Sequence, residues 1–330
     1  MEDRKDVNMI LAGDVGGTKT ILGLFEKPQP RPVPVVVRAF PTADFTNLTA
    51  MISAFFADTS AGRHAVTAAC FGVAGPVLAR TAVLSNARLD IDAGDVAKTF
   101  GIPRVELLND LQAMAWSVRV LKASETHVLQ QGVMREDGNL ALIAAGTGVN
   151  EVLIHHVDGR FVPAASEAGH ADWAARSERD MVMLKALVAR YGRAEVEHVV
   201  SGLGLRNIHR VTHQTPCLAV LSADDVDAPA KMSQAAMARR CAGCVESLSL
   251  FVEAYGAEAG NLALRGLATG GVFIGGGIAP KILPLLTDGQ FMRAFLDKGE
   301  FRGLLTQVPV KVILNAEAGL IGAAVAAAQP

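Results

Sequence analysis

The sequence predicts an α/β protein with two domains of similar build. Its 330 residues exceed the usual length of one domain. Strand-like apolar runs alternate with segments of helical periodicity. Two apolar runs joined by a glycine-rich turn occur in residues 9–25, and the same pattern restarts in residues 140–156. This repeat lies in the order of elements, not in residue identities, and it predicts two related domains.

The first half of the chain reads as a hairpin followed by alternating elements. Strands are expected at residues 9–14, 19–25, 35–39, 65–75 and 105–110. Apolar residues recur at helical spacing in TNLTAMISAFFAD, which predicts an amphipathic helix. Another helix is expected from LQAMAWSVRVL, directly after the last of these strands.

The second half repeats the scheme with more helix. A helix is expected over residues 177–192, because Ser177 is a plausible N-cap and Gly192 a stop. One long helical stretch is expected over about 231–259. TGGVFIGGGIAPKIL reads as strand, glycine triplet and helix, VKVIL as a strand, and residues 316–328 as an Ala-rich final helix.

Composition and charge exclude several classes of protein. Half of the residues are hydrophobic and 19% are charged, which supports a sizeable core and argues against disorder. The net charge of −2, with no long basic run, argues against a sequence-independent nucleic-acid surface. No signal peptide and no membrane-spanning apolar stretch is recognised. A cytoplasmic protein with no membrane partner is expected.

The cysteines and histidines are read as structural. Four cysteines are too few for a disulfide scaffold in a chain of this length. Cys241 and Cys244 form a C-x-x-C, but they fall in what reads as helix interior, so structural thiols are favoured over a zinc or redox role. His209 and His213 could share a helix face, yet no third ligand is evident.

The turn GDVGGTKT nearly spells a phosphate-binding P-loop. Thr18 stands where that loop needs glycine, however, and a strand rather than a helix follows Lys19. A plain hairpin and a different phosphate cradle remain open as interpretations. In a cradle, the backbone N–H groups of glycines approach phosphate oxygens, and a carboxylate such as Asp14 suits Mg²⁺.

Two further glycine turns follow apolar strands. Ala145-Gly146-Thr147-Gly148 is the first, and Gly275-Gly276-Gly277 is the second. Each alone is a weak signal, and neither the triplet nor SGLGLRN fits the dinucleotide pattern. Together, the three turns favour a nucleotide held in a cleft between two related domains.

Several polar residues could act on a hydroxyl substrate. Asp110 follows an apolar strand in LLNDLQA and could serve as a general base, although it could instead cap the next helix. Glu167 and His170 in SEAGH could bind adjacent sugar hydroxyls, or they could be a loop glutamate and a surface histidine. Glu197 sits on what reads as a helical segment, and Asn86 is ambiguous with a turn residue.

These motifs, in this order, resemble the bacterial glucokinase family of the sugar kinase, heat-shock protein and actin superfamily. The resemblance runs from about residue 10 to 325. GDVGGTKT and AAGTG resemble its phosphate motifs, TGGVFIGGGIAPKI its adenosine motif, LLNDLQAMA its catalytic strand end, and SEAGH and EHVVSGLGL its sugar-binding segments.

The resemblance implies a fold, a reaction and a set of site residues. It implies two related RNase H-like (actin-like ATPase) domains flanking a cleft, a discontinuous small domain of residues 1–111 plus 316–330, and a large domain of residues 112–315. It implies phosphorylation of glucose by ATP with Mg²⁺, the entry step of glycolysis, in a homodimer. The implied residues are Asp110 as base; Asn86, Asn109, Asp110, Glu167, His170 and Glu197 at the sugar; Gly16, Gly17, Thr18 and Thr147 at phosphates; Gly276 and Gly277 at adenosine; and Asp14 at Mg²⁺ through water.

The sequence departs from the family in four places. Ala168 replaces a glycine of the sugar motif, and Asn150 and Glu151 follow the second turn. Lys19 makes the first turn, GGTKT, more similar to that of the related repressor and kinase family. That family carries a cysteine-rich zinc motif after its Gly-His. A zinc of that kind is not expected, because residues 170–216 hold no cysteine.

Three other functions are weighed against a glucose kinase. A kinase for mannose, fructose or an N-acetylated hexosamine would share the fold and the base. A non-catalytic sugar sensor would need a DNA-binding module, and few residues precede the first expected strand. A P-loop NTPase would leave SEAGH and the third glycine turn unexplained.

Overall fold

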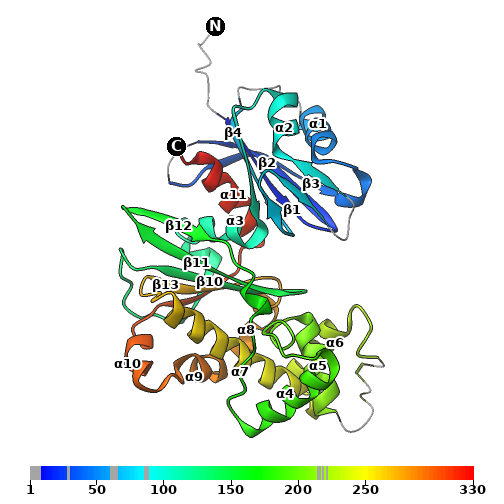
Figure 1. Ribbon diagram of the computed structural model, residues 1–330, viewed down its shortest axis with the longest axis vertical. Coiled ribbons are helices and arrows are strands. Elements are labelled where there is room, and N and C mark those ends of the chain that lie inside the picture. Colours follow the sequence, from blue (N-terminus) through cyan, green and yellow to red (C-terminus); the bar gives the residue numbers. More distant parts are fainter. Residues whose placement is uncertain are drawn as a thin grey trace. The chain divides into compact units, whose positions relative to one another are not determined.

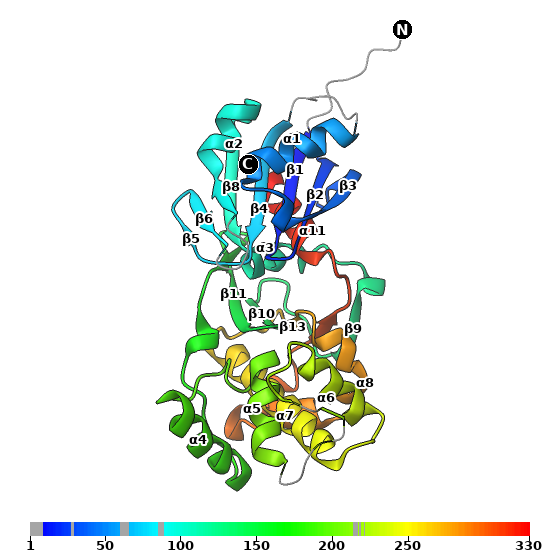
Figure 2. The same cartoon turned by 90° about the vertical axis from the view of Figure 1, so that its right-hand side faces the viewer.

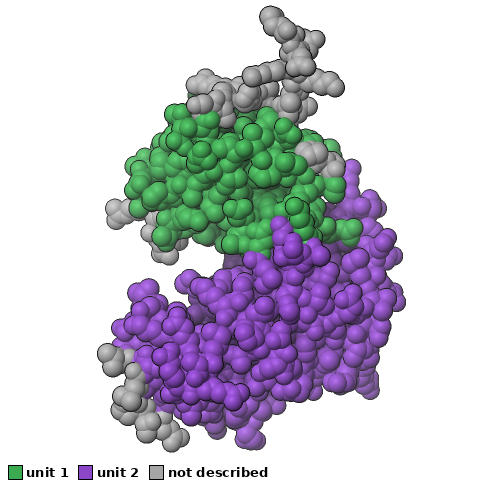
Figure 3. All heavy atoms as spheres, turned by 180° about the vertical axis from the view of Figure 1, so that it is seen from behind, with its two compact units in different colours: residues 1–122, 315–330 green, residues 123–314 purple. Residues whose placement is uncertain are grey.

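The computed structural model describes residues 9–27, 30–59, 66–84, 89–213, 217, 219–220 and 222–330. Figure 1 and Figure 2 show the course of the chain in two views. Its contacts divide it into two compact units, coloured separately in Figure 3. Unit 1 comprises residues 1–122 and 315–330, and unit 2 comprises residues 123–314. Each unit has its own sheet.

Unit 1 is built on a five-stranded sheet of order β3-β2-β1-β4-β8. Its strands are β1 (Met9–Val15), β2 (Lys19–Glu26), β3 (Val33–Pro41), β4 (Val66–Val73) and β8 (Arg104–Asn109). The first three strands are antiparallel neighbours, whereas β1, β4 and β8 run parallel. The predicted hairpin and third strand are therefore confirmed.

Helices cover both faces of this sheet. Alternate residues of β1 point to opposite faces, as in any strand. Leu11 packs in a cluster with residues of α1 (Leu48–Thr59) and α2 (Ala93–Phe100). Ile10 packs with residues of α3 (Asp110–Ser117) and the final helix α11 (Ala318–Ala328). The C-terminal helix thus completes the core of unit 1, as Figure 1 shows.

Short elements fill the remainder of unit 1. A three-stranded sheet contains β5 (Val77–Leu78), β6 (Thr81–Val83) and β7 (Asp90–Asp92). The 3₁₀ turn η1 (Thr42–Asp44) directly follows β3.

Unit 2 is built on a six-stranded sheet of order β12-β11-β10-β13-β14-β9. Its strands are β9 (Thr126–Gln130), β10 (Leu140–Ala145), β11 (Val149–Val157), β12 (Arg160–Ala164), β13 (Gly271–Gly275) and β14 (Val310–Ile313). Strand β10 pairs antiparallel with β11 and parallel with β13. Strand β1 has the same two kinds of neighbour in unit 1, which bears out the predicted restart of the pattern.

Unit 2 carries more helix than unit 1. Its helices are α4 (Glu178–Tyr191), α5 (Gly202–Thr212), α6 (Ala228–Met237), α7 (Ala242–Arg265), α8 (Leu283–Leu286), α9 (Gln290–Leu296) and α10 (Arg302–Leu305). The 3₁₀ turns are η2 (Ala123–Glu125), η3 (Ala168–His170), η4 (Ala279–Ile282) and η5 (Gly299–Phe301). The long helix α7 packs on the sheet, where the buried Tyr255 hydroxyl donates to the Gly275 carbonyl at 3.1 Å.

Two expected helices differ from the structure. The single stretch over 231–259 is wrong, because α6 ends at Met237 and α7 begins at Ala242. Arg239 interrupts it with a φ of 53°, which a helix does not allow. The helix expected after the glycine triplet begins instead as the 3₁₀ turn η4. Within the described ranges, no helix is both long and apolar enough to span a membrane.

Candidate functional site

The first glycine turn is held by a buried threonine from outside it. The Thr42 hydroxyl donates to the Gly16 carbonyl at 2.8 Å and bonds the Thr20 hydroxyl at 2.9 Å. The Thr42 N–H donates to the Thr18 carbonyl at 3.0 Å. A Cβ on Gly16 would lie 2.9 Å from the Lys19 carbonyl oxygen, which explains glycine at this position. Sequence reasoning missed Thr42, because its contacts are set by the register of β3 against β2.

Asp14 and Asp110 lie at the same edge of the unit 1 sheet. Asp14 is opposite Gly72 on β4, and Gly72 is opposite Leu108 on β8, which leads directly into Asn109 and Asp110. Burial, and secondly the negative charge of Asp110, raise the pKa of Asp14 to about 6, against the opposing effect of Lys19. The two carboxylates therefore repel each other in a partly desolvated place.

Glycines make room for both carboxylates. A Cβ on Gly319, at the start of α11, would lie 2.9 Å from the Asp14 carboxylate. A Cβ on Gly72 would lie 2.7 Å from the Cβ of Ala113, so α3 packs closely over β4. This close approach fixes the first turn of α3, where Asp110 is located.

The residue that caps α3 is Asn109. Its side-chain oxygen accepts from the Leu111 N–H at 3.0 Å, and its amide donates to the Gly75 carbonyl at 3.5 Å. Asp110 is the first helical residue, and its carboxylate also accepts from the Leu111 N–H, at 2.7 Å.

The second and third glycine turns lie side by side at the ends of β10 and β13. A Cβ on Gly276 would lie 2.3 Å from the Ala145 carbonyl oxygen, and φ of Gly276 is 84°. The Ile278 N–H donates to the same oxygen at 3.2 Å. Thr147 and Gly277 are exposed at this place. The backbone of these turns is therefore accessible to a phosphate-bearing ligand.

Helix α5 begins against the second turn. Its first residue, Gly202, donates its N–H to the Gly146 carbonyl at 2.8 Å. Ser201 caps the helix by accepting from the Gly204 N–H at 2.9 Å. A helix N-terminus attracts anions. Sequence reasoning discarded SGLGLRN as a failed dinucleotide motif and so missed this contact; the signal was a serine N-cap.

The sugar-motif segment and Glu197 form one hydrogen-bonded cluster at the start of β11. The Glu197 N–H donates to the Gly169 carbonyl at 2.8 Å, and the Glu197 carboxylate accepts from the Val149 N–H at 3.1 Å. A Cβ on Gly169 would lie 1.9 Å from the Val149 carbonyl oxygen. Glu197 lies in a turn between α4 and α5, so the helical segment expected for it is wrong. Glu167, next to Ala168, is exposed.

His170 is oriented by an acidic residue that the sequence did not suggest. Its Nδ1 lies 2.9 Å from a carboxylate oxygen of Glu195. That bond is the main cause of the raised pKa of His170. Arg193 donates to the His170 carbonyl at 2.6 Å and pairs with Glu195 at 3.6 Å. Asn86, the remaining expected sugar ligand, lies outside the described residues.

Asn150 and Glu151 point away from the second turn. The Asn150 amide donates to the Ser166 carbonyl at 2.6 Å. The Glu151 carboxylate, 2% exposed, meets α7, where Arg265 donates to it at 3.3 Å and to Glu258 at 2.6 Å. Burial and the charge of Glu258 raise the pKa of Glu151 to about 8, against the effect of Arg265. Of these two departures from the family, Glu151 therefore contacts the core helix α7, whereas Asn150 contacts the segment before the sugar motif.

This carboxyl pair predicts a pH-dependent stability. The folded protein keeps the Glu151 proton up to about pH 8, whereas an unperturbed glutamate releases it near 4.5. The stability contribution is therefore full below pH 4.5 and is lost as the pH rises to about 8. The unfolding free energy of Glu151→Gln relative to the wild type should therefore increase by roughly 1–3 kcal/mol as the pH rises from 5 to 8, measured by urea unfolding. The exposed Glu300→Gln is the control, and a pH-independent difference for Glu151→Gln would contradict the assignment.

Comparisons with known proteins identify the family of the chain. The family model described as Glucokinase matches residues 11–330. The glucokinase of Nostoc punctiforme is 36% identical, over 98% of this chain and 100% of that protein. That of Synechocystis sp. is 38% identical, over 97% of this chain and 98% of that protein.

Solved structures share the fold. The crystal structure of glucokinase from an Antarctic psychrotroph gives a TM-score of 0.87 at 28% identity, over 97% of this chain and 98% of that one. A ROK family glucokinase from Streptomyces griseus gives a TM-score of 0.61 at 22% identity, over 98% and 100%, and so shows the fold alone. With the family model spanning nearly all of its length, the chain belongs to the glucokinase family.

Proposed function

We propose that this chain transfers the γ-phosphoryl group of ATP to the 6-hydroxyl of glucose, giving glucose 6-phosphate and ADP. The observation that carries the proposal is the pair of carboxylates at one sheet edge, where burial and secondly the charge of Asp110 raise the pKa of Asp14. A carboxylate at a strand end can accept the proton of an attacking hydroxyl, while positioning supplies most of the remaining catalysis.

We assign Asp110 as the base for the 6-hydroxyl and Asn109 as a ligand of a neighbouring hydroxyl. In unit 2, Glu167, His170 and Glu197 bind further sugar hydroxyls. Asn86 joins this set from the family resemblance alone. Polar groups that a wrong sugar covers and leaves unpaired would set specificity.

The glycine turns take the nucleotide in this proposal. Gly16, Gly17, Thr18 and Thr147 contact phosphates, and Gly276 and Gly277 lie near the adenosine. Two observations support the roles of Thr147 and Gly277: both residues are exposed, and the two turns share contacts with Ala145. The structure from Streptomyces griseus holds glucose and AMPPNP, an ATP analogue, and one from Balamuthia mandrillaris holds glucose.

Asp14 fits a magnesium ion. Carboxylate oxygens are ligands that Mg²⁺ prefers, usually with several waters retained. A cation would offset both the burial and the repulsion from Asp110 that raise the pKa of Asp14. Asp14 would hold the ion through water, and bound Mg²⁺ would neutralise charge on the phosphates.

A panel of sugars tests the proposed function. ADP release is measured with glucose, mannose, fructose and N-acetylglucosamine, and glucose 6-phosphate is detected separately. Glucose should give the highest kcat/KM, with phosphate on the 6-hydroxyl. A higher value for another sugar would transfer the proposal to that hexose, and ATP turnover independent of sugar would overturn it.

Following the family, we also propose a cytoplasmic homodimer. Light scattering on the purified protein would test the dimer by measuring its mass.

A further inference from the structure

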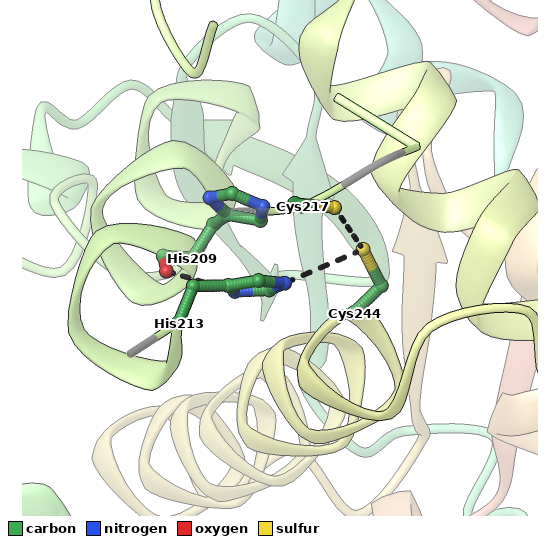
Figure 4. Close-up of side chains that lie close together, drawn as sticks. All are labelled: His209, His213, Cys217 and Cys244. Atoms are coloured by element: carbon green, nitrogen blue, oxygen red, sulfur yellow. Dashed lines mark hydrogen bonds between the residues drawn. The ribbon is translucent and has the colours of Figure 1, made fainter. Parts of the chain in front are cut away.

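A cluster of thiols and imidazoles lies in unit 2 among residues to which the proposed function assigns no role. His209 is on α5, His213 directly follows that helix, and Cys217 lies in the next segment. Cys241 and Cys244 stand at the start of α7. Figure 4 shows His209, His213, Cys217 and Cys244 gathered together, with ligand atoms all within 4.8 Å of one another. Cys217 and the C-x-x-C thus lie beside the two histidines, a grouping that the sequence did not reveal.

The spacing of these atoms suits a tetrahedral metal ion. Cys217 Sγ lies 3.7 Å from Sγ of both Cys241 and Cys244. His213 Nε2 lies 3.4 Å from Cys241 Sγ and 3.8 Å from Cys244 Sγ. Zinc bonds of about 2.3 Å to sulfur and 2.0–2.1 Å to nitrogen give tetrahedral edges of about 3.8 Å and 3.6 Å. The observed separations match these edges, and they are far longer than the roughly 2.05 Å of a disulfide.

The imidazole of His213 is set up to offer Nε2. Its Nδ1 lies 3.0 Å from the His209 carbonyl oxygen, which can only accept a hydrogen bond. The proton therefore resides on Nδ1, and the lone pair of Nε2 points at the sulfurs. Histidines that bind metals are commonly oriented by this kind of outer hydrogen bond.

His209 covers one face of this group. Its ring stacks on that of His213 with centroids 3.6 Å apart and 24° between planes. A metal ion lies in the plane of the imidazole that binds it. Because the ring of His209 is stacked on that of His213, an ion bound to His213 would lie outside the plane of the His209 ring. The Nε2 of His209 is buried and has no partner among the described residues.

The start of α7 is shaped around the same place. Cys241 is the N-cap of the helix, yet its side chain makes no capping bond. A Cβ on Gly243 would lie 2.6 Å from Nε2 of His213, so only glycine allows the ring to approach the helix this closely. A helix N-terminus also stabilises thiolates, the form in which cysteine binds metal.

We propose that Cys217, Cys241, Cys244 and His213 form a structural zinc site. The ion binds the three Sγ atoms and Nε2 of His213, and it joins the end of α5 to the start of α7. The other end of α5 contacts the second glycine turn through Gly202, so the ion anchors the helix whose first residue lies beside that turn. Because these four ligands complete the coordination, the role is structural rather than catalytic.

The test measures metal in the purified full-length protein. Zinc should be present at about one ion per chain by elemental analysis, and a strong chelator should lower the Tm. Co²⁺ in place of zinc should give tetrahedral d–d bands and a thiolate charge-transfer band. Less than about a tenth of an ion in protein produced with zinc, with no Co²⁺ bands on titration, would overturn the proposal. So would a native disulfide between Cys217 and either other cysteine.

Single variants test the ligand set. Cys241→Ser and Cys244→Ser should each weaken zinc binding by more than about 100-fold, since losing even an outer partner costs 10- to 100-fold. Cys70→Ala removes a buried thiol of unit 1 and should keep the metal. His209→Phe keeps a ring in the stack and should also keep it. Zinc lost from His209→Phe but kept by Cys241→Ser would show that the stated ligands are wrong. If a cysteine variant fails to fold, the Co²⁺ spectrum of the wild type still decides, because its charge-transfer intensity reports the number of thiolates.

Discussion

Asp110→Asn is expected to lower kcat for glucose-dependent ADP release by about 10²- to 10⁴-fold, the usual contribution of a general base. Asparagine keeps the shape of the side chain and an oxygen to accept from the Leu111 N–H, which Asp110 does at 2.7 Å. The capping of α3 rests on Asn109, which the substitution leaves in place. The fold and the Tm should therefore change little, and the loss should appear in kcat rather than in the KM for ATP.

The control for this variant is Asp95→Asn, which removes an exposed carboxylate from the first turn of α2 in the same unit. Both variants are assayed for ADP release and for glucose 6-phosphate across a range of glucose concentrations. Asp110→Asn retaining more than about a tenth of the wild-type kcat would show that Asp110 is not the base. A loss of Tm as large as the loss of activity would point to a structural role instead.

Local sequence chemistry predicted the elements near the site well. The glycine turn between two apolar runs was enough to predict the hairpin of β1 and β2, because such turns are encoded within a few residues. Thr42 could not be found in this way, since it reaches Gly16 only through the pairing of β3 with β2. Glu195 was missed for the same reason, being 25 residues from His170 in the chain.

The break between α6 and α7 shows a different limit. Residues 231–259 carry a continuous helical pattern, and the residue that interrupts it is Arg239, in a backbone conformation that glycine usually adopts. The pattern therefore placed Cys241 and Cys244 inside a helix, whereas the structure places them in its first turn. Cys217, which lies 24 residues from Cys241, could then not be recognised as their neighbour.

Gly169→Ala is expected to lower kcat/KM for glucose by about 10²-fold or more. The new methyl group would lie 1.9 Å from the Val149 carbonyl oxygen, which is backbone and cannot rotate away. Either η3 or the start of β11 must shift, and both carry the cluster that holds Glu197. A displacement of about 1 Å in a substrate-binding group can cost 10²-fold in rate. Overpacking of this kind should also cost about 1–3 kcal/mol of unfolding free energy.

Gly303→Ala is the matched control, because it makes the same change in unit 2 where a Cβ would meet nothing within 4 Å. It lies in the short helix α10, where alanine should be neutral or slightly stabilising. Kinetics at varied glucose and at varied ATP distinguish the effects on the two substrates. The displaced cluster is proposed to bind the sugar, so the effect is expected with glucose as the varied substrate. An unchanged kcat/KM for glucose in a folded Gly169→Ala protein would show that this segment does not position the sugar, whatever the result for Asp110.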